Sequence, residues 1–170
     1  MPASPAAQAA QKFAETYGAL VTGAAKTLPA TASGDIFLVT GGRVIVTSLT
    51  GVVSTIIQAQ ATTLSVGNKP TGGSSAVATL CATADLNAKP VGTSLAVPQA
   101  KASALIVSGA DGTLLWNTTS GAQGVPFENG GIALVPAGSI QVTTGATSTG
   151  AITWSVTWVP YDAGAVVTAA

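Results

Sequence analysis

The chain has 170 residues, of which 47% are hydrophobic, so it is long enough for one domain with a substantial core. Only 7% of the residues are charged, and six basic groups balance six acidic ones, whereas an ordinary soluble domain is about 25% charged. The basic residues are scattered, the single cysteine excludes a disulfide scaffold, and no apolar stretch is long enough for a transmembrane helix. We therefore expect neither nucleic acid nor a membrane as a partner.

Residues 1–34 differ in composition from the rest of the chain and are predicted to form an N-terminal arm. Residues 6–25 are rich in alanine, and Phe13, Tyr17 and Leu20 fall at helical spacing on one narrow face. Two glycines interrupt this pattern, so the segment is helical or extended and needs a surface on which to dock. These three side chains are candidates for contact with a neighbouring chain, and the alternative is a helix that covers its own domain. We expect proteases to cut the free protein between residues 26 and 34.

Residues 35–170 carry the signals of short strands and turns and are predicted to form one β domain. About nine or ten strands are predicted, at 36–40, 43–49, 52–60 (with 62–66 as its continuation or a strand of its own), 76–83, 93–97, 102–108, 113–118, 132–135, 139–144 and 151–160. The Gly41-Gly42 pair predicts a two-residue hairpin loop, and the composition of residues 67–75 predicts a longer loop.

The strand predicted at residues 151–160 has the clearest pattern in the chain. Ile152, Trp154, Val156 and Trp158 alternate with threonine and serine, so one face of this strand is buried and the other is polar. We predict that Phe37, Trp154, Val156 and Trp158 anchor the core. The number and spacing of the strands favour an all-β fold, mainly antiparallel, of the β-sandwich or jelly-roll type. A closed barrel is the alternative.

The chain lacks the residues on which most catalytic sites depend. It has no histidine, and its one cysteine, Cys81, lies in an apolar segment that predicts a buried, inert thiol. No phosphate-binding glycine loop or nucleophile elbow is present, and zinc without histidine or clustered cysteine is not expected. The sequence therefore predicts no enzyme, no cofactor and no metal site.

Pairs of carboxylates are the one catalytic arrangement that the composition leaves open. Sandwich folds can host glycosidases, which use two acids, and three tryptophans could stack on sugar rings. The candidate acids are Asp85, Asp111, Glu128 and Asp162, and the tryptophans are Trp116, Trp154 and Trp158. Two of the acids lie beside turn signals, where carboxylates are normally solvated, and two of the tryptophans follow the buried pattern of their strand. We therefore rank the glycosidase interpretation last.

Two segments resemble small structural proteins of tailed bacteriophages. The first is residues 36–51, Ile-Phe-Leu-Val-Thr-Gly-Gly-Arg-Val-Ile-Val-Thr-Ser-Leu-Thr-Gly, and the second is residues 150–165, Gly-Ala-Ile-Thr-Trp-Ser-Val-Thr-Trp-Val-Pro-Tyr-Asp-Ala-Gly-Ala. The resemblance covers roughly residues 35–167, and it rests on β-rich runs and turn glycines. It implies a virion protein of β-sandwich type, such as a capsid decoration (cement) protein or a head fibre.

The composition agrees with this resemblance, since a protein with almost no net charge suits a surface that neighbours cover. We expect a decoration protein, made in the host cytoplasm, on the outside of the phage head. It would bridge subunits of the major capsid protein and associate with copies of itself, with a homotrimer favoured. The alternatives are a head- or tail-fibre module that binds a host surface or sugar, and a tail-tube or connector subunit.

Overall fold

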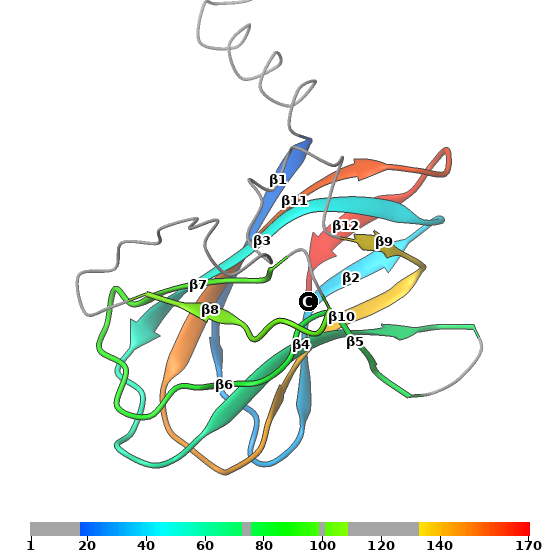
Figure 1. Ribbon diagram of the computed structural model, residues 1–170. Coiled ribbons are helices and arrows are strands. Elements are labelled where there is room, and N and C mark those ends of the chain that lie inside the picture. Colours follow the sequence, from blue (N-terminus) through cyan, green and yellow to red (C-terminus); the bar gives the residue numbers. More distant parts are fainter. Residues whose placement is uncertain (1–17, 73–75, 99–100, 109–132) are drawn as a thin grey trace, which may run out of the picture.

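The computed structural model describes residues 18–72, 76–98, 101–108 and 133–170, and these residues form strands and turns (Figure 1). The strands are β1 (Ala19–Thr27), β2 (Ser33–Thr40), β3 (Val44–Thr55), β4 (Thr63–Pro70), β5 (Ala78–Thr79), β6 (Ala84–Asp85), β7 (Ser94–Ala96), β8 (Ile106–Val107), β9 (Ala133–Val135), β10 (Gly138–Thr144), β11 (Ala151–Pro160) and β12 (Val166–Ala169). They pair antiparallel in two sheets, which confirms the predicted all-β fold of sandwich type.

The two sheets, here called sheet A and sheet B, each have six strands within the described residues. Sheet A has the order β1-β11-β3-β7-β8, with β9 also paired to β3. Sheet B has the order β12-β2-β10-β4-β5, with β6 also paired to β4. Their longest strands are rich in valine, isoleucine and threonine, which fit a pleated surface that is buried on one side.

The hydrophobic core lies between the two sheets. The inward-facing residues of β11 meet those of β2, β4 and β10, and Trp154 and Phe37 are the largest fully buried side chains. Trp154, Val156 and Trp158 are 2%, 0% and 8% exposed, and Phe37 is 0% exposed. The structure therefore buries all four of the side chains that the sequence predicts as core anchors.

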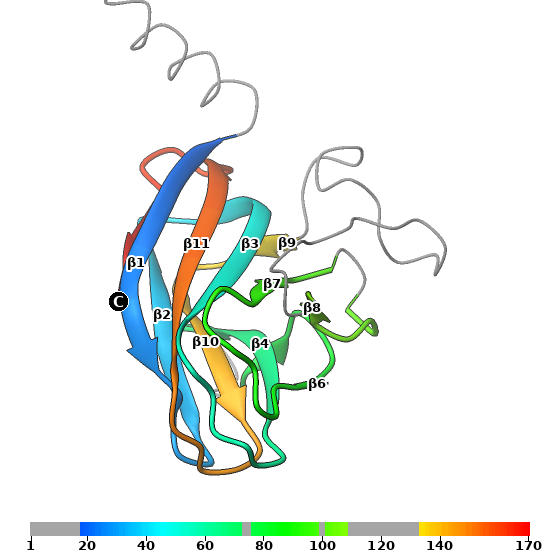
Figure 2. The ribbon, with the colours of Figure 1, turned by 90° about the vertical axis from the view of Figure 1, so that its left-hand side faces the viewer.

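The two sheets also approach each other along both edges of the sandwich. On one edge β1 lies next to β12 (Figure 2). The ammonium of Lys26 on β1 donates a hydrogen bond to the backbone oxygen of Ala170, just after β12. On the other edge an isolated bridge joins Ala82 to Ala104, with the Leu105 amide donating to the Ala82 carbonyl at 3.0 Å. The fold is thus a sandwich with links at its edges, between the two architectures considered from the sequence.

The predicted arm of residues 1–34 is wrong in its second half. Residues 19–27 form β1, which pairs with β11 from Ala19 opposite Trp158 to Thr27 opposite Ala151. Without β1 the backbone groups on one edge of β11 would be unpaired, because β3 pairs only with the other edge. This pairing outweighs the helical preference of alanine. The β domain therefore begins by Gly18 and not at residue 35. Phe13 and Tyr17 lie outside the described residues.

The predicted hairpin at Gly41-Gly42 is also wrong. β2 belongs to sheet B and β3 to sheet A, so this glycine pair carries the chain from one sheet to the other. Gly41 has φ = 74°, and a Cβ there would lie 2.2 Å from the carbonyl oxygen of Gly164. Glycine is needed because the backbone is left-handed at this position and another segment of the same chain lies too close for a side chain.

Several predicted strand limits also shift. The strands predicted at 43–49 and 52–60 are one strand, β3, and β4 extends to Pro70, through half of the predicted loop 67–75. Within the strand predicted at 76–83 only β5 is a strand, and within the strand predicted at 102–108 only β8 is a strand. The strand predicted at 113–118 lies outside the described residues.

Candidate functional site

The candidate glycosidase carboxylates do not come together in the described part of the chain. The Asp85 carboxylate accepts hydrogen bonds from the amides of Thr62 and Asn87, at 3.2 and 3.0 Å. Asp85 is paired with Thr63 at the first residue of β4, whereas Asp162 lies at the opposite end of the sandwich, beside Arg43. Asp111, Glu128 and Trp116 are outside the described residues.

The residues that the structure describes contain neither a metal-binding cluster nor a membrane-spanning helix. Within those ranges no group of three or more histidine, cysteine, aspartate or glutamate residues could hold a metal ion. The same part of the chain contains no helix long and apolar enough to cross a membrane. The Cys81 thiol is fully buried, and this burial raises its pKa.

Arg43 and Asp162 form an ion pair that joins two of the connections between the sheets, the one from β2 to β3 and the one from β11 to β12. Three nitrogens of Arg43 (the backbone amide, Nε and one terminal nitrogen) donate to the Asp162 carboxylate, each at 2.8 Å. The guanidinium also lies over the Tyr161 ring, 4.6 Å from its centroid. The hydrogen bonds from Arg43 lower the pKa of Asp162 to about 2. The pair thus holds the residue before β3 against the segment that follows β11.

The outer face of sheet A is free of charge among the residues that the structure describes. Its strands contain one charged residue, Lys26, whose ammonium is bound at the Ala170 carbonyl on the edge of the sandwich. We call this surface the neutral face, and it consists of the outward-facing residues Leu20, Thr22, Ile45, Ser48, Thr50, Val52, Leu134, Thr153, Ser155, Thr157 and Val159. Hydroxyl and aliphatic groups therefore make up this surface.

Large aliphatic side chains are exposed on the neutral face. Leu20, Val52 and Leu134 are 62%, 46% and 50% exposed. Across one end of the sheet, Val159 pairs with Ile45, which pairs in turn with Leu134. Leu20, the one predicted partner-contact residue that the structure describes, lies on β1 opposite Thr157 and so is diagonal to Val159. Apolar groups from four strands therefore gather at this end of the neutral face.

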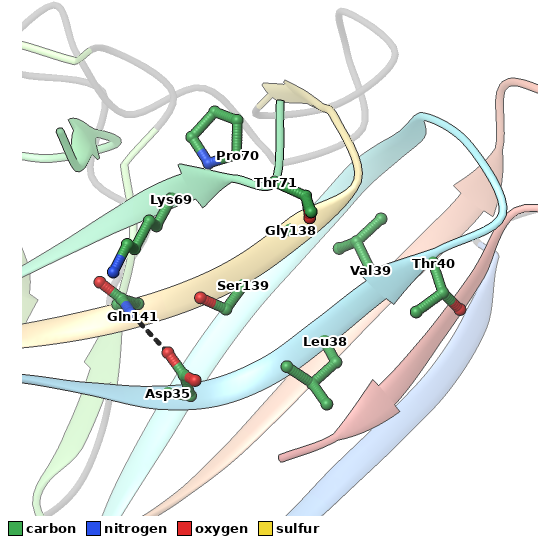
Figure 3. A pocket seen from close by; sticks show the side chains of 10 residues that line it. All are labelled: Asp35, Leu38, Val39, Thr40, Lys69, Pro70, Thr71, Gly138, Ser139 and Gln141. Atoms are coloured by element: carbon green, nitrogen blue, oxygen red, sulfur yellow. Dashed lines mark hydrogen bonds between the residues drawn. The ribbon is translucent and has the colours of Figure 1, made fainter. Parts of the chain in front are cut away.

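The outer face of sheet B differs because it carries charged groups and a pocket of about 340 Å³ (Figure 3). The pocket lies over β2, β10 and β4, and it is lined by Asp35, Leu38, Val39, Thr40, Lys69, Pro70, Thr71, Gly138, Ser139 and Gln141. Gln141 is opposite Asp35 on one side and Gly67 on the other, so it lies in the middle of the sheet.

Sequence patterns alone do not identify this pocket. One signal was present, because Ser139, Gln141 and Thr143 alternate with buried aliphatic residues along β10. That pattern places polar groups on the outer face, but it does not show that Asp35 and Lys69 lie on either side of Gln141.

The chain was also compared with known proteins. It matches no protein-family model, no curated protein and no solved structure.

Proposed function

We propose that this chain is a non-enzymatic structural protein of a virus particle, a decoration protein that stabilises the head of a tailed bacteriophage. The proposal combines the sequence resemblance with one structural observation, the neutral face. A surface with exposed aliphatic groups and without charge is suited to lasting contact with another protein. The partner would be the major capsid protein, with one copy of this chain bridging neighbouring capsid subunits.

The mechanism is a shift in equilibrium and requires no chemical step. A protein that binds the assembled shell more tightly than it binds free subunits stabilises the assembled state. Contact through the neutral face would derive its free energy from apolar burial and hydroxyl hydrogen bonds. Such binding should depend little on salt, because the face offers no exposed ion pairs for salt to screen. The homotrimeric state stays a prediction.

A matched pair of substitutions tests which face binds the particle. Val52 on β3 is 46% exposed on the neutral face, and Val166 on β12 is 44% exposed on the outer side of sheet B. Val52→Lys should weaken binding to phage particles that lack this protein by tenfold or more, about 1.4 kcal/mol. Co-sedimentation of the variant with the particles measures this affinity. Val166→Lys should bind like the wild type. Equal binding of both variants, or loss with Val166→Lys alone, would contradict the assignment of the neutral face.

The copy number of the chain in purified virions separates the remaining alternatives. Hundreds of copies would agree with a shell protein, and we expect that result. A dozen copies or fewer would instead indicate a connector or a fibre tip.

A further inference from the structure

The pocket on sheet B contains a buried acceptor whose hydrogen bond is missing. Gln141 is 7% exposed, its Nε2 group donates to Oδ1 of Asp35, and its Oε1 atom has no partner among the described residues. The orientation of the amide is determined by this contact, because a carboxylate accepts hydrogen bonds and so must face the NH₂ group. The Oε1 atom is therefore directed away from Asp35. Buried acceptors are normally hydrogen-bonded, so this unpaired oxygen indicates a site for a donor.

The other polar groups of the pocket surround this acceptor. Lys69 and Ser139 are paired across β4 and β10, and Leu38 is opposite Ser139 on β2. Figure 3 shows the ammonium of Lys69 and the Gln141 amide on one side of the pocket, with Leu38 on the other side. Acceptors, a donor and an apolar surface thus converge on one depression, whose size lies within the roughly 300–1,000 Å³ of small-molecule sites.

These groups restrict the ligand to one chemical class. Gln141 Oε1 and the Asp35 carboxylate need donors, whereas Lys69 needs an acceptor. An anion would be repelled by the Asp35 carboxylate, and a cation would be repelled by the Lys69 ammonium. A hard metal ion would require more oxygen ligands than one carboxylate and one amide supply. Adjacent hydroxyl groups donate and accept at once, and the C–H face of a sugar ring can lie against Leu38 or Pro70.

We propose that the pocket over β2, β10 and β4 binds a neutral saccharide, with Gln141 and Asp35 accepting from its hydroxyl groups and Lys69 donating to it. The site lies on the outer side of sheet B, and the neutral face lies on the opposite side of the sandwich. A chain attached through the neutral face would therefore leave this pocket accessible. The saccharide site does not depend on the proposed role in a phage head, and each can fail without the other.

Chemical-shift titration of the full chain tests the site. The probes are the methyl glycosides of glucose, galactose, mannose and N-acetylglucosamine, each raised to high millimolar concentration. We expect saturable shifts of the Gln141 side-chain NH₂ group and of the Lys69 and Ser139 amides with at least one probe. Absence of these shifts with all four probes would overturn the proposal. Larger shifts of the same signals with sodium phosphate would also overturn it, since they would indicate an anion site.

Variants connect the shifts to the unpaired acceptor. Gln141→Met has a similar length and lacks Oε1, and it should weaken binding at least tenfold. Thr143→Val is the matched control, because residue 143 is the next outward position on β10 and lies outside this pocket. Lys69→Met, at an exposed position, should weaken binding several-fold and gives a second test if Gln141→Met does not fold. Wild-type affinity in both pocket variants, or equal losses in Thr143→Val and Gln141→Met, would contradict the assignment.

Discussion

Trp154 and Gly51 are paired residues of β11 and β3, and the indole ring occupies the space that a side chain at residue 51 would need. A Cβ at Gly51 would lie 2.9 Å from Cε3 of Trp154 and 3.0 Å from Cγ2 of Ile152. The glycine in the middle of a long strand is therefore explained by a close approach of the tryptophan.

Removal of this ring tests the core. Trp154→Ala should lower the free energy of unfolding by about 3–5 kcal/mol, the usual cost of deleting a large buried aromatic side chain. Gly51→Ala should cost about 1–3 kcal/mol, because the added methyl group overpacks the same contact. Chemical denaturation measures both changes. A loss below about 1 kcal/mol for Trp154→Ala would contradict the burial of the ring.

The ion pair of Asp162 and Arg43 predicts a dependence of stability on pH. The pKa of Asp162 falls from 3.8 to about 2 on folding, so the ionised carboxylate stabilises the folded state above pH 3.8. This contribution is lost as the pH falls through about 2, where the folded protein also takes up the proton. Asp162→Asn should therefore lower the melting temperature at pH 7 and have little effect near pH 2. Calorimetry of the wild type and the variant at the two pH values measures this, and an equal deficit at both would exclude the ion pair as its cause.

The pairing of β1 with β11 predicts protection from proteolysis after Lys26, where the sequence alone predicts cleavage. Lys26 is paired with Ile152 and Thr27 with Ala151, and the Leu28 amide donates to the Gly150 carbonyl at 3.1 Å. A paired strand cannot enter a protease site, so trypsin should spare the bond after Lys26 in the free, folded protein. Lys101 lies exposed in a turn and is the internal control, where we expect cleavage. Cleavage after Lys26 at the same rate as after Lys101 would mean that β1 separates readily from β11.

Local sequence patterns predict some elements well and others poorly, for physical reasons. The alternation in β11 identifies both the strand and its buried face, because that face packs on a core whatever the pairing. The alanine-rich β1 has no such pattern, and it is a strand because β11 offers it an open edge. The Gly41-Gly42 pair shows the same limit, since two glycines permit a hairpin and a crossing between sheets equally. The partners of Gln141 depend on the register of three strands, which no local pattern contains.

Across the whole molecule, the two outer faces of the sandwich differ in their chemistry. Sheet A presents hydroxyl and aliphatic groups, whereas sheet B presents Asp35, Lys69 and the pocket around Gln141. Because the sheets are stacked, these surfaces point in opposite directions (Figures 1 and 2). Under the proposed function, the neutral face would attach the chain to the shell, and the pocket on sheet B would be left accessible to a small ligand.

The central claim is that this chain stabilises an assembled shell by contact. The most direct test measures the temperature at which phage particles release their DNA, with and without this protein, and locates the protein by immunolabelling. We expect label over the head and a higher release temperature when the protein is present, with the same increase in low and high sodium chloride. An unchanged release temperature, or label confined to the tail, would contradict this account.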